Sequence, residues 1–385
     1  MVALAQRCSS LASEFDAMAV ASVLASFVKL TDASSDTRGP RSDSFAAAAA
    51  AAAATGKTAA SAQPASGDAC HEAVTALHVR ASAIASTFNG QDVANTLHAC
   101  AKLTSSGRAS RPSDTLIASL TGRAASPEVL ATLRPKELVN ILWACSTLRA
   151  TTAAAVPPTT LSALFQAVHK QCTTTFTSRD VSTVLWSLAR GFSPTRGSSK
   201  RVEDEEIEET ERGNTSVPAP VPVSLLKALA ARATNLVHTF NGQDVANTLW
   251  ALAKLSSNSS TDRSSVNSNQ STSSSGSIQG SAAASVVHDK SYLAAFPPIE
   301  VIAALEGQFA RVLPTCNGQN VSNGLWAITK LNRSLPLNVL EAACARLPHV
   351  TCTMQPLQVR NIYVWRHSFK LAQINKCIRM RGQQL

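Results

Sequence analysis

Apolar side chains recur at helical spacing through much of this 385-residue chain. The clearest segment is Phe240–Leu255, which reads FNGQDVANTLWALAKL and would carry one apolar stripe as a helix. The stripe consists of Val245, Leu249, Leu252 and Leu255. Asn241 lies three residues before Asp244, which is the spacing of a helix N-cap. Because Asn89 with Asp92 and Thr177 with Asp180 repeat this spacing, the sequence predicts helices that begin after Asn89, Thr177 and Asn241.

This segment is one copy of a repeated motif. Phe88–Leu103 reads FNGQDVANTLHACAKL and agrees with Phe240–Leu255 at 14 of 16 positions. Looser copies are Phe15–Leu30, Leu133–Leu148, Phe176–Gly191 and Cys316–Leu331, with a degenerate copy at Met354–Phe369. The shortest steps between copies give a unit of about 38–45 residues, which is typical of two-helix solenoid repeats.

A second amphipathic run precedes the motif in several units. These runs are Leu161–Thr175, Leu225–Thr239, Ile299–Leu313 and Leu337–Leu347. Prolines at 157–158, 297–298 and 336 come just before three of them, which suits the first turn of a helix. A helix pair of this size cannot bury its apolar faces alone, so neighbouring pairs must stack. We therefore predict an all-α fold, specifically an α-solenoid of two-helix repeats with long disordered inserts.

The inserts divide the chain. Their Ala/Ser-rich, acidic, Pro-rich and Ser/Asn-rich compositions cannot form a packed core. The predicted division is a truncated first repeat at 1–30, an Ala/Ser linker at 31–68, three repeats at 69–191, an acidic and Pro-rich insert at 192–222, one repeat at 223–255, a Ser/Asn-rich insert at 256–290, two repeats at 291–371, and a basic tail at 372–385. Because only about 14 residues precede Phe15, we expect that this sequence lacks its true N-terminus.

Composition narrows the class of protein. The formal net charge of +10 favours polyanionic partners such as nucleic acid or anionic lipid. No segment approaches the roughly 18 consecutive apolar residues of a transmembrane helix, so we expect no membrane span. The nine cysteines form no C-x-x-C pair and no zinc-finger spacing. We therefore expect structural thiols in a reducing compartment.

No residue pattern indicates catalysis. The triplet Gly56–Thr58 resembles the end of a phosphate-binding loop, but the required earlier glycine is replaced by Ala51. The eight histidines include no H-E-x-x-H motif and no pairing with cysteine that suits a nucleophile. We therefore expect a protein with no enzymatic activity, no metal and no cofactor.

The tryptophans form the first of three columns across the repeats. Trp143, Trp186, Trp250 and Trp326 share one motif position, where other copies have His98 and Ala25. Our preferred interpretation is packing between helices, because Trp250 borders the apolar stripe. Stacking on unpaired bases is the alternative, and it contributes about 1–3 kcal/mol per base in proteins that use it.

Two polar columns accompany the tryptophans. One column consists of asparagines, with Asn361 as a further member and with Ser22 and Thr183 as small polar substitutes. The other column consists of cations that lie seven residues after the asparagine position. Residues seven apart lie on nearly the same helix face, so we expect one polar, basic surface that also includes the motif glutamines. The candidate RNA-binding residues are Gln91, Asn95, Lys102, Asn140, Arg190, Gln243, Asn247, Lys254, Gln319, Asn323 and Lys330. Two alternatives remain open, namely an asparagine ladder between helices and lysines that balance the helix dipole.

The motif resembles the repeat of the octotricopeptide repeat proteins of algal organelles. It is also similar to the leucine-rich repeats of the FAST-kinase-like family. The matching residues are Phe240, Gln243, Asp244, Ala246, Asn247, Leu249, Trp250, Ala251, Leu252, Ala253, Lys254 and Leu255, with Val245 in place of leucine. The proline-led start lacks the acid–Trp ending common in that family, and no C-terminal RAP domain is recognisable in the sequence.

The resemblance implies a function in an organelle. Such proteins bind single-stranded organellar transcripts and act in RNA stability, RNA processing or translation. The resemblance therefore implies an RNA partner and a location in the chloroplast, with the mitochondrion as the alternative. A helical-repeat scaffold for protein–protein interaction, with partners held partly by the inserts, is the second hypothesis.

Overall fold

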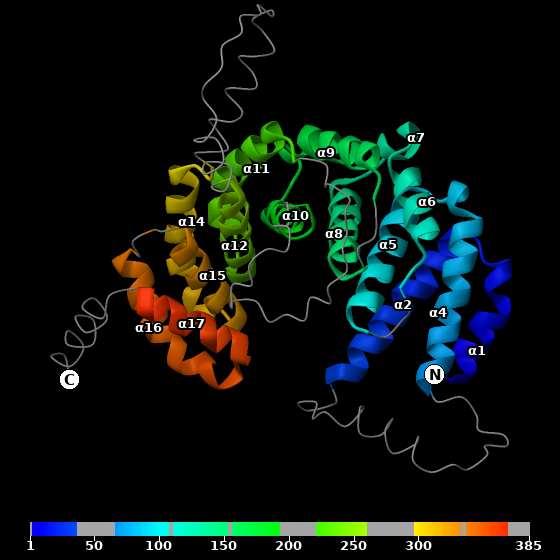
Figure 1. Ribbon diagram of the computed structural model, residues 1–385, viewed down its shortest axis with the longest axis horizontal. Helices are drawn as coiled ribbons and strands as arrows, with labels where there is room; N and C mark the ends of the chain where they lie inside the picture. Colours follow the sequence, from blue (N-terminus) through cyan, green and yellow to red (C-terminus); the bar gives the residue numbers. More distant parts are fainter. Residues whose placement is uncertain are drawn as a thin grey trace, which may run out of the picture. The chain divides into compact units, whose positions relative to one another are not determined.

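A computed structural model describes residues 2–36, 66–107, 111–152, 156–192, 221–259, 296–331, 333 and 336–368 of the chain. All regular secondary structure in these ranges is helical, which confirms the predicted all-α class (Figure 1). The polyalanine segment, the Gly56–Thr58 triplet, the acidic run, nearly all of the Ser/Asn-rich segment and the basic tail lie outside the described residues.

The first of two compact units comprises residues 1–160. Its helices are α1 (Val2–Leu11), α2 (Ala17–Asp36), α4 (Ser66–Ala83), α5 (Gly90–Ser105), α6 (Asp114–Ala124), α7 (Pro127–Leu130) and α8 (Pro135–Thr152). The motif helices pack in chain order, α2 against α5 and α5 against α8. The leading helices form a second series, α1 against α4 and α4 against α6. Successive helix pairs therefore stack within this unit, as Figure 1 shows.

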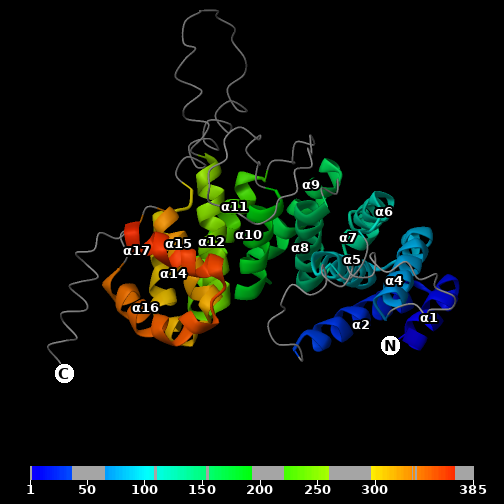
Figure 2. The ribbon, with the colours of Figure 1, turned by 60° about the horizontal axis from the view of Figure 1, so that its bottom comes forward.

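The second unit comprises residues 161–385 and repeats this arrangement. Its helices are α9 (Pro158–Cys172), which begins at the end of the first unit, α10 (Ser178–Gly191), α11 (Val223–Leu236), α12 (Gly242–Ser259), α14 (Ile299–Val312), α15 (Gly318–Lys330), α16 (Leu337–Val350) and α17 (Pro356–Ser368). The motif helices α10, α12, α15 and α17 pack in that order (Figure 2). The leading helices α11, α14 and α16 pack in a second series. A single array through both units remains a prediction.

The predicted N-cap residues are found at the beginnings of the motif helices. The side chain of Asn89 accepts a hydrogen bond from the backbone N–H of Asp92 at 2.9 Å, and Asn241 caps α12 in the same way. Thr177 and Asp180 form a reciprocal capping box at the start of α10. Asn317 caps α15 in the same way as Asn89 caps α5, although it was not among the cap residues predicted from the sequence. The observed caps satisfy backbone donors that an uncapped first turn would leave unpaired.

Several helix boundaries differ from the predicted division. Helix α2 continues to Asp36 and α12 to Ser259, so both motif helices run past the expected repeat ends at residues 30 and 255. Helix α4 begins at Ser66, within the segment assigned to the Ala/Ser linker. The small polar residues at these ends permit extra helical turns, which a composition boundary does not reveal. The three-repeat block expected at 69–191 is also divided, because the boundary between the compact units follows Thr160.

The first motif position supplies the core between the two series. Phe88, Phe176 and Phe240 are completely or almost completely buried. In the motifs that begin at Phe88, Phe240 and Cys316, a glycine two residues later is buried as well, because the next repeat packs directly on it. A Cβ atom at Gly242 would lie 2.5 Å from Cys316 Sγ, and one at Gly318 would lie 2.7 Å from a Met354 side-chain carbon. The motif glycine therefore allows the next repeat to approach closely.

Long polar side chains of the leading helices join successive repeats. Each donates a hydrogen bond to the backbone carbonyl of the first motif residue in the preceding repeat. The pairs are Arg80 with Phe15, Arg123 with Phe88, Arg232 with Phe176, Gln308 with Phe240 and Arg346 with Cys316, at donor–acceptor distances of 2.7–3.1 Å. These repeat-joining side chains were not identified from the sequence. Their signal was present, since Arg80, Arg232, Gln308 and Arg346 each lie eight residues before the next motif.

Candidate nucleic-acid interface

Four side chains of each complete motif helix share one face. In α12 they are Gln243, Asn247, Trp250 and Lys254, with spacings of four, three and four residues. Residues spaced in this way lie above one another on a helix. The corresponding residues are Gln91, Asn95, His98 and Lys102 in α5 and Gln319, Asn323, Trp326 and Lys330 in α15. We refer to this set as the motif stripe.

Helix packing brings neighbouring stripes together within each unit. In the first unit α5 lies against α8, which carries Asn140 and Trp143. In the second unit α12 lies between α10 and α15, as both ribbon views show (Figures 1 and 2). Three stripes are therefore adjacent in the second unit, and two in the first. The sequence predicted that stripes of neighbouring repeats would align. Their alignment within each unit follows from the packing of each motif helix on the next.

The outer members of the stripe reach solvent. Gln91, Gln243 and Gln319 are exposed, as are Lys102, Arg190 and Lys330. Lys254 and the four asparagines are half-buried. All eleven candidate residues therefore retain solvent access, and none has its side chain in the interior.

The asparagine column does not form the ladder that was the alternative interpretation. Among the described residues, the side-chain amides of Asn95, Asn140, Asn247 and Asn323 make no hydrogen bond to a neighbouring helix. Adjacent motif helices are joined instead through the position before the asparagine. There Ser182 Oγ donates to the Asp244 carbonyl at 3.1 Å, and Ser322 Oγ donates to the Gln358 carbonyl at 3.2 Å. The asparagine amides thus retain their donors and acceptors for other partners.

The tryptophans lie at the junctions between motif helices, in line with the preferred interpretation, but they are not fully buried. All four are half-buried, and each lies against a cation of the stripe. Lys102 of α5 lies over the ring of Trp143 in α8, with Nζ 5.8 Å from the ring centroid. In the second unit the rings of Trp186 and Trp250 are neighbours, with centroids 6.3 Å apart. Tryptophan therefore lines the junction between motif helices beneath the charged groups.

In five of the motif helices, negative charge is confined to the first turn. In α5, α8, α10, α12 and α15 the acidic residues are Asp92, Glu137, Asp180 and Asp244, all in the first turn. Burial raises the pKa of Asp92 and of Asp244 above the usual aspartate range. Glu137 pairs with Arg134, and Asp180 belongs to the capping box. The later turns of these helices, where the stripe cations lie, carry no acidic residue.

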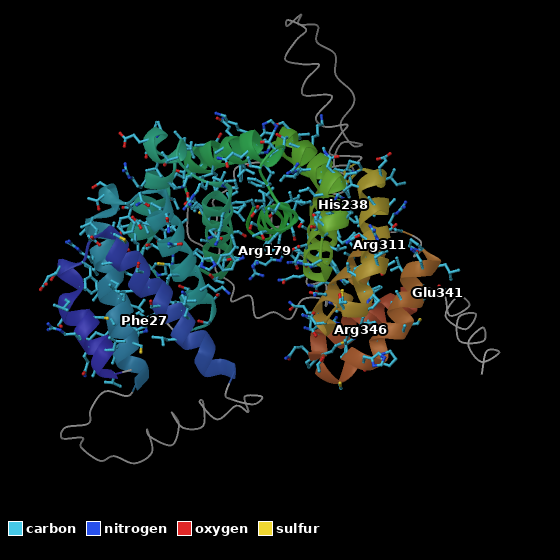
Figure 3. The ribbon with its side chains drawn as sticks, turned by 180° about the vertical axis from the view of Figure 1, so that it is seen from behind. Phe27, Arg179, His238, Arg311, Glu341 and Arg346 are labelled. Carbon is cyan, nitrogen blue, oxygen red and sulfur yellow. The ribbon has the colours of Figure 1, made fainter. Side chains whose placement is uncertain are left out.

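Two further cations belong to the stripe. Lys136 of α8 and Arg179 of α10 occupy the glutamine position, and both are exposed (Arg179 is labelled in Figure 3). The sequence contained the signal, because each lies four residues before Asn140 or its substitute Thr183. Arg134 lies at the same edge, where its Nη2 donates to Gln91 Oε1 of the adjacent helix at 3.2 Å. The motif stripes therefore carry more positively charged side chains than the cation column alone predicted.

The cysteines of the described residues form no disulfide bond. Burial raises the pKa of Cys100 and of Cys145 to about 12. Such thiols remain protonated and are poor nucleophiles near neutral pH. The described residues contain no cluster of three or more histidine, cysteine or acidic side chains able to hold a metal ion.

None of the helices in the described part of the chain combines the length and apolarity needed to cross a bilayer. Comparison of the whole sequence with protein-family models and with curated proteins finds no match to either.

Proposed function

We propose that the protein binds single-stranded RNA through the motif stripes and acts in RNA stability, processing or translation in an organelle. One observation supports this above all, namely the exposed or half-buried amides and cations that adjacent motif helices carry on one face. The resemblance of the motif to octotricopeptide repeats supports RNA as the partner and the chloroplast, or alternatively the mitochondrion, as the location.

The two polar columns have different roles in this proposal. The cations Lys102, Arg190, Lys254 and Lys330 contact phosphate groups, which gives affinity without sequence preference. The amides of the asparagine and glutamine columns hydrogen-bond to base edges, which single-stranded RNA presents freely. Sequence preference therefore depends on the amides and affinity on the cations. A duplex hides these edges, so we expect weak binding to double-stranded RNA.

A matched pair of charge reversals tests the proposal. The stripe variant combines Lys102→Glu, Lys254→Glu and Lys330→Glu. The control variant combines Arg7→Glu, Lys170→Glu and Arg311→Glu, which changes the net charge equally at exposed positions of leading helices. RNA selected from a random pool by the unmodified protein is then titrated against all three proteins at several salt concentrations.

The proposal predicts that the stripe variant loses most of its affinity, while the control variant binds within a few-fold of the original. The slope of log K against log salt should also fall by about two in the stripe variant, because three phosphate contacts are lost. Equal losses in both variants would indicate unspecific attraction by net charge. If the pool yields no enriched sequence, and protein partners captured by the chain survive nuclease treatment, the scaffold hypothesis replaces this one.

A further inference from the structure

Aromatic rings and cations alternate along the stripes of the second unit. Lys254 Nζ lies 5.7 Å from the ring centroid of Trp250 on its own helix and 5.4 Å from that of Trp326 on the next helix. Lys330 Nζ lies 5.8 Å from the Trp326 centroid, and Arg190 Cζ lies 5.1 Å from the Trp186 centroid. All four distances are within the range of about 6 Å over which a cation is attracted to an aromatic ring.

Contacts within one helix could follow from sequence spacing alone, since residues four apart on a helix are neighbours. Two of the contacts cross between helices and do not follow from it. Lys102 has His98 rather than tryptophan four residues before it, yet its ammonium group lies over Trp143 of the next helix. Lys254 contacts the tryptophans of both its own helix and the next. The cation–tryptophan contact is therefore a property of the packed repeats.

These contacts bear on how the tryptophans would serve an RNA ligand. A base can stack only on a ring face that nothing else covers, and the cations lie over these rings. A lysine side chain, by contrast, has a flexible four-carbon stem and loses considerable rotamer entropy when it is fixed. A ring that holds the ammonium group in the free protein removes part of that cost from the binding step.

We propose that the tryptophan column positions the stripe cations for the phosphodiester backbone of RNA and does not stack on bases. This inference rests on the proposed function, and it assigns Trp143, Trp186, Trp250 and Trp326 as positioning residues that act through Lys102, Arg190, Lys254 and Lys330. Trp326 has the largest expected effect, because both Lys254 and Lys330 lie over its ring.

A double-mutant cycle separates positioning from stacking. Trp326→Leu is made in the unmodified protein and in a Lys254→Gln, Lys330→Gln background, and the dissociation constant of one single-stranded RNA is measured for all four proteins. Positioning predicts that Trp326→Leu weakens binding roughly threefold to tenfold in the unmodified protein and has almost no effect in the glutamine background. Stacking predicts the same loss in both backgrounds, and that result would overturn the inference.

Two controls guard against a change of fold. Trp326→Phe keeps an aromatic face and should restore most of the lost affinity. Phe165→Leu removes a buried ring that packs edge-on against Phe192, with centroids 5.6 Å apart, away from the stripe. It should change affinity equally in both backgrounds, because any effect comes through stability. Equal weakening by Trp326→Phe and Trp326→Leu would also contradict positioning.

A measurement without RNA distinguishes failure of this inference from failure of the proposed function. In the free protein, the side-chain protons next to the Lys254 ammonium group should show an upfield ring-current shift in the NMR spectrum, and Trp326→Leu should reduce it. An unshifted Lys254 overturns the inference even when RNA binds. Shifted resonances in a protein that binds no RNA overturn the proposed function and, with it, the role assigned to the tryptophans.

Discussion

Arg346 Nε donates a hydrogen bond of 2.8 Å to the backbone carbonyl of Cys316, and this contact joins α16 to the start of the preceding motif (Arg346 is labelled in Figure 3). Equivalent contacts from Arg80, Arg123 and Arg232 use three more cations of the leading helices. These arginines therefore serve the packing of the repeats. The positive charge of the described residues therefore divides into these structural arginines and cations that reach solvent, among them those of the motif stripe.

Loss of a repeat-joining arginine should lower stability without changing the RNA interface. Arg346→Ala leaves the Cys316 carbonyl without its charged donor, so we expect a loss of about 1–3 kcal/mol in the free energy of unfolding. Arg311→Ala, on the exposed side of the neighbouring leading helix, is the control and should change stability by less than about 0.5 kcal/mol. Urea denaturation followed by circular dichroism measures both. Reduced RNA affinity of folded Arg346→Ala protein would count against the division of charge.

A pair of glycine substitutions tests how closely the helices of one repeat approach. A Cβ atom at Gly324 of α15 would overlap the ring of the buried Phe309 in α14, whereas a Cβ atom at Gly307 would meet nothing within 4 Å. Gly324→Ala should therefore destabilise the protein by about 1–3 kcal/mol, because the ring has no room to move. Gly307→Ala should stabilise it by about 0.5–1 kcal/mol, since alanine is the better helix former. Thermal denaturation should give shifts of opposite sign, and shifts of the same sign would contradict the packing.

The first unit should lose stability in mild acid because of His78. Burial, aided by the charge of His71, lowers the pKa of His78 to about 4, and its Nε2 lies 3.3 Å from Cys100 Sγ. The unfolded chain takes up a proton on this ring near pH 6.5, whereas the folded chain does not until about pH 4. The unfolded state thus binds more protons in that window, so stability falls as the pH drops through it, by about 3 kcal/mol in total.

The test compares how strongly stability depends on pH in two variants. His78→Gln should remove this contribution, so its urea midpoint should fall less between pH 7 and pH 4.5 than that of the unmodified protein. His238→Gln, at an exposed position, should retain the original dependence. Identical pH profiles for His78→Gln and the unmodified protein would show that His78 is not kept neutral by burial.

The asparagine column should control RNA affinity through its amide group. Asn247→Asp keeps the size of the side chain but replaces the donor with a charged acceptor near phosphate, so we expect affinity to fall about tenfold or more. Asn235→Asp is the matched control, because Asn235 is exposed on the leading helix α11. Filter binding with the selected RNA measures both. Equal effects would show that added negative charge, and not the position, weakens binding.

Much of the fold could be predicted because each signal acts over a few residues. The caps at Asn89, Thr177 and Asn241 depend on contacts three residues apart, and the apolar stripe depends on helical period. The helix ends at Asp36 and Ser259 were missed, since polar residues at a helix terminus resemble those of a linker. The contact of Arg346 with Cys316 was missed for another reason, namely that it joins residues 30 positions apart.

The sequence alone determined the helical class, the repeat unit and the columns of asparagine, tryptophan and cation, because these follow from periodicity along the chain. Tertiary structure alone decided what those columns contact. It placed the motif helices side by side within each unit and set Lys254 against two tryptophans from different helices. Among the described residues, it also left the four asparagine amides without a hydrogen bond to a neighbouring motif helix. The physical reason is that spacing along one helix specifies a face, whereas the partner of that face depends on how whole helices pack.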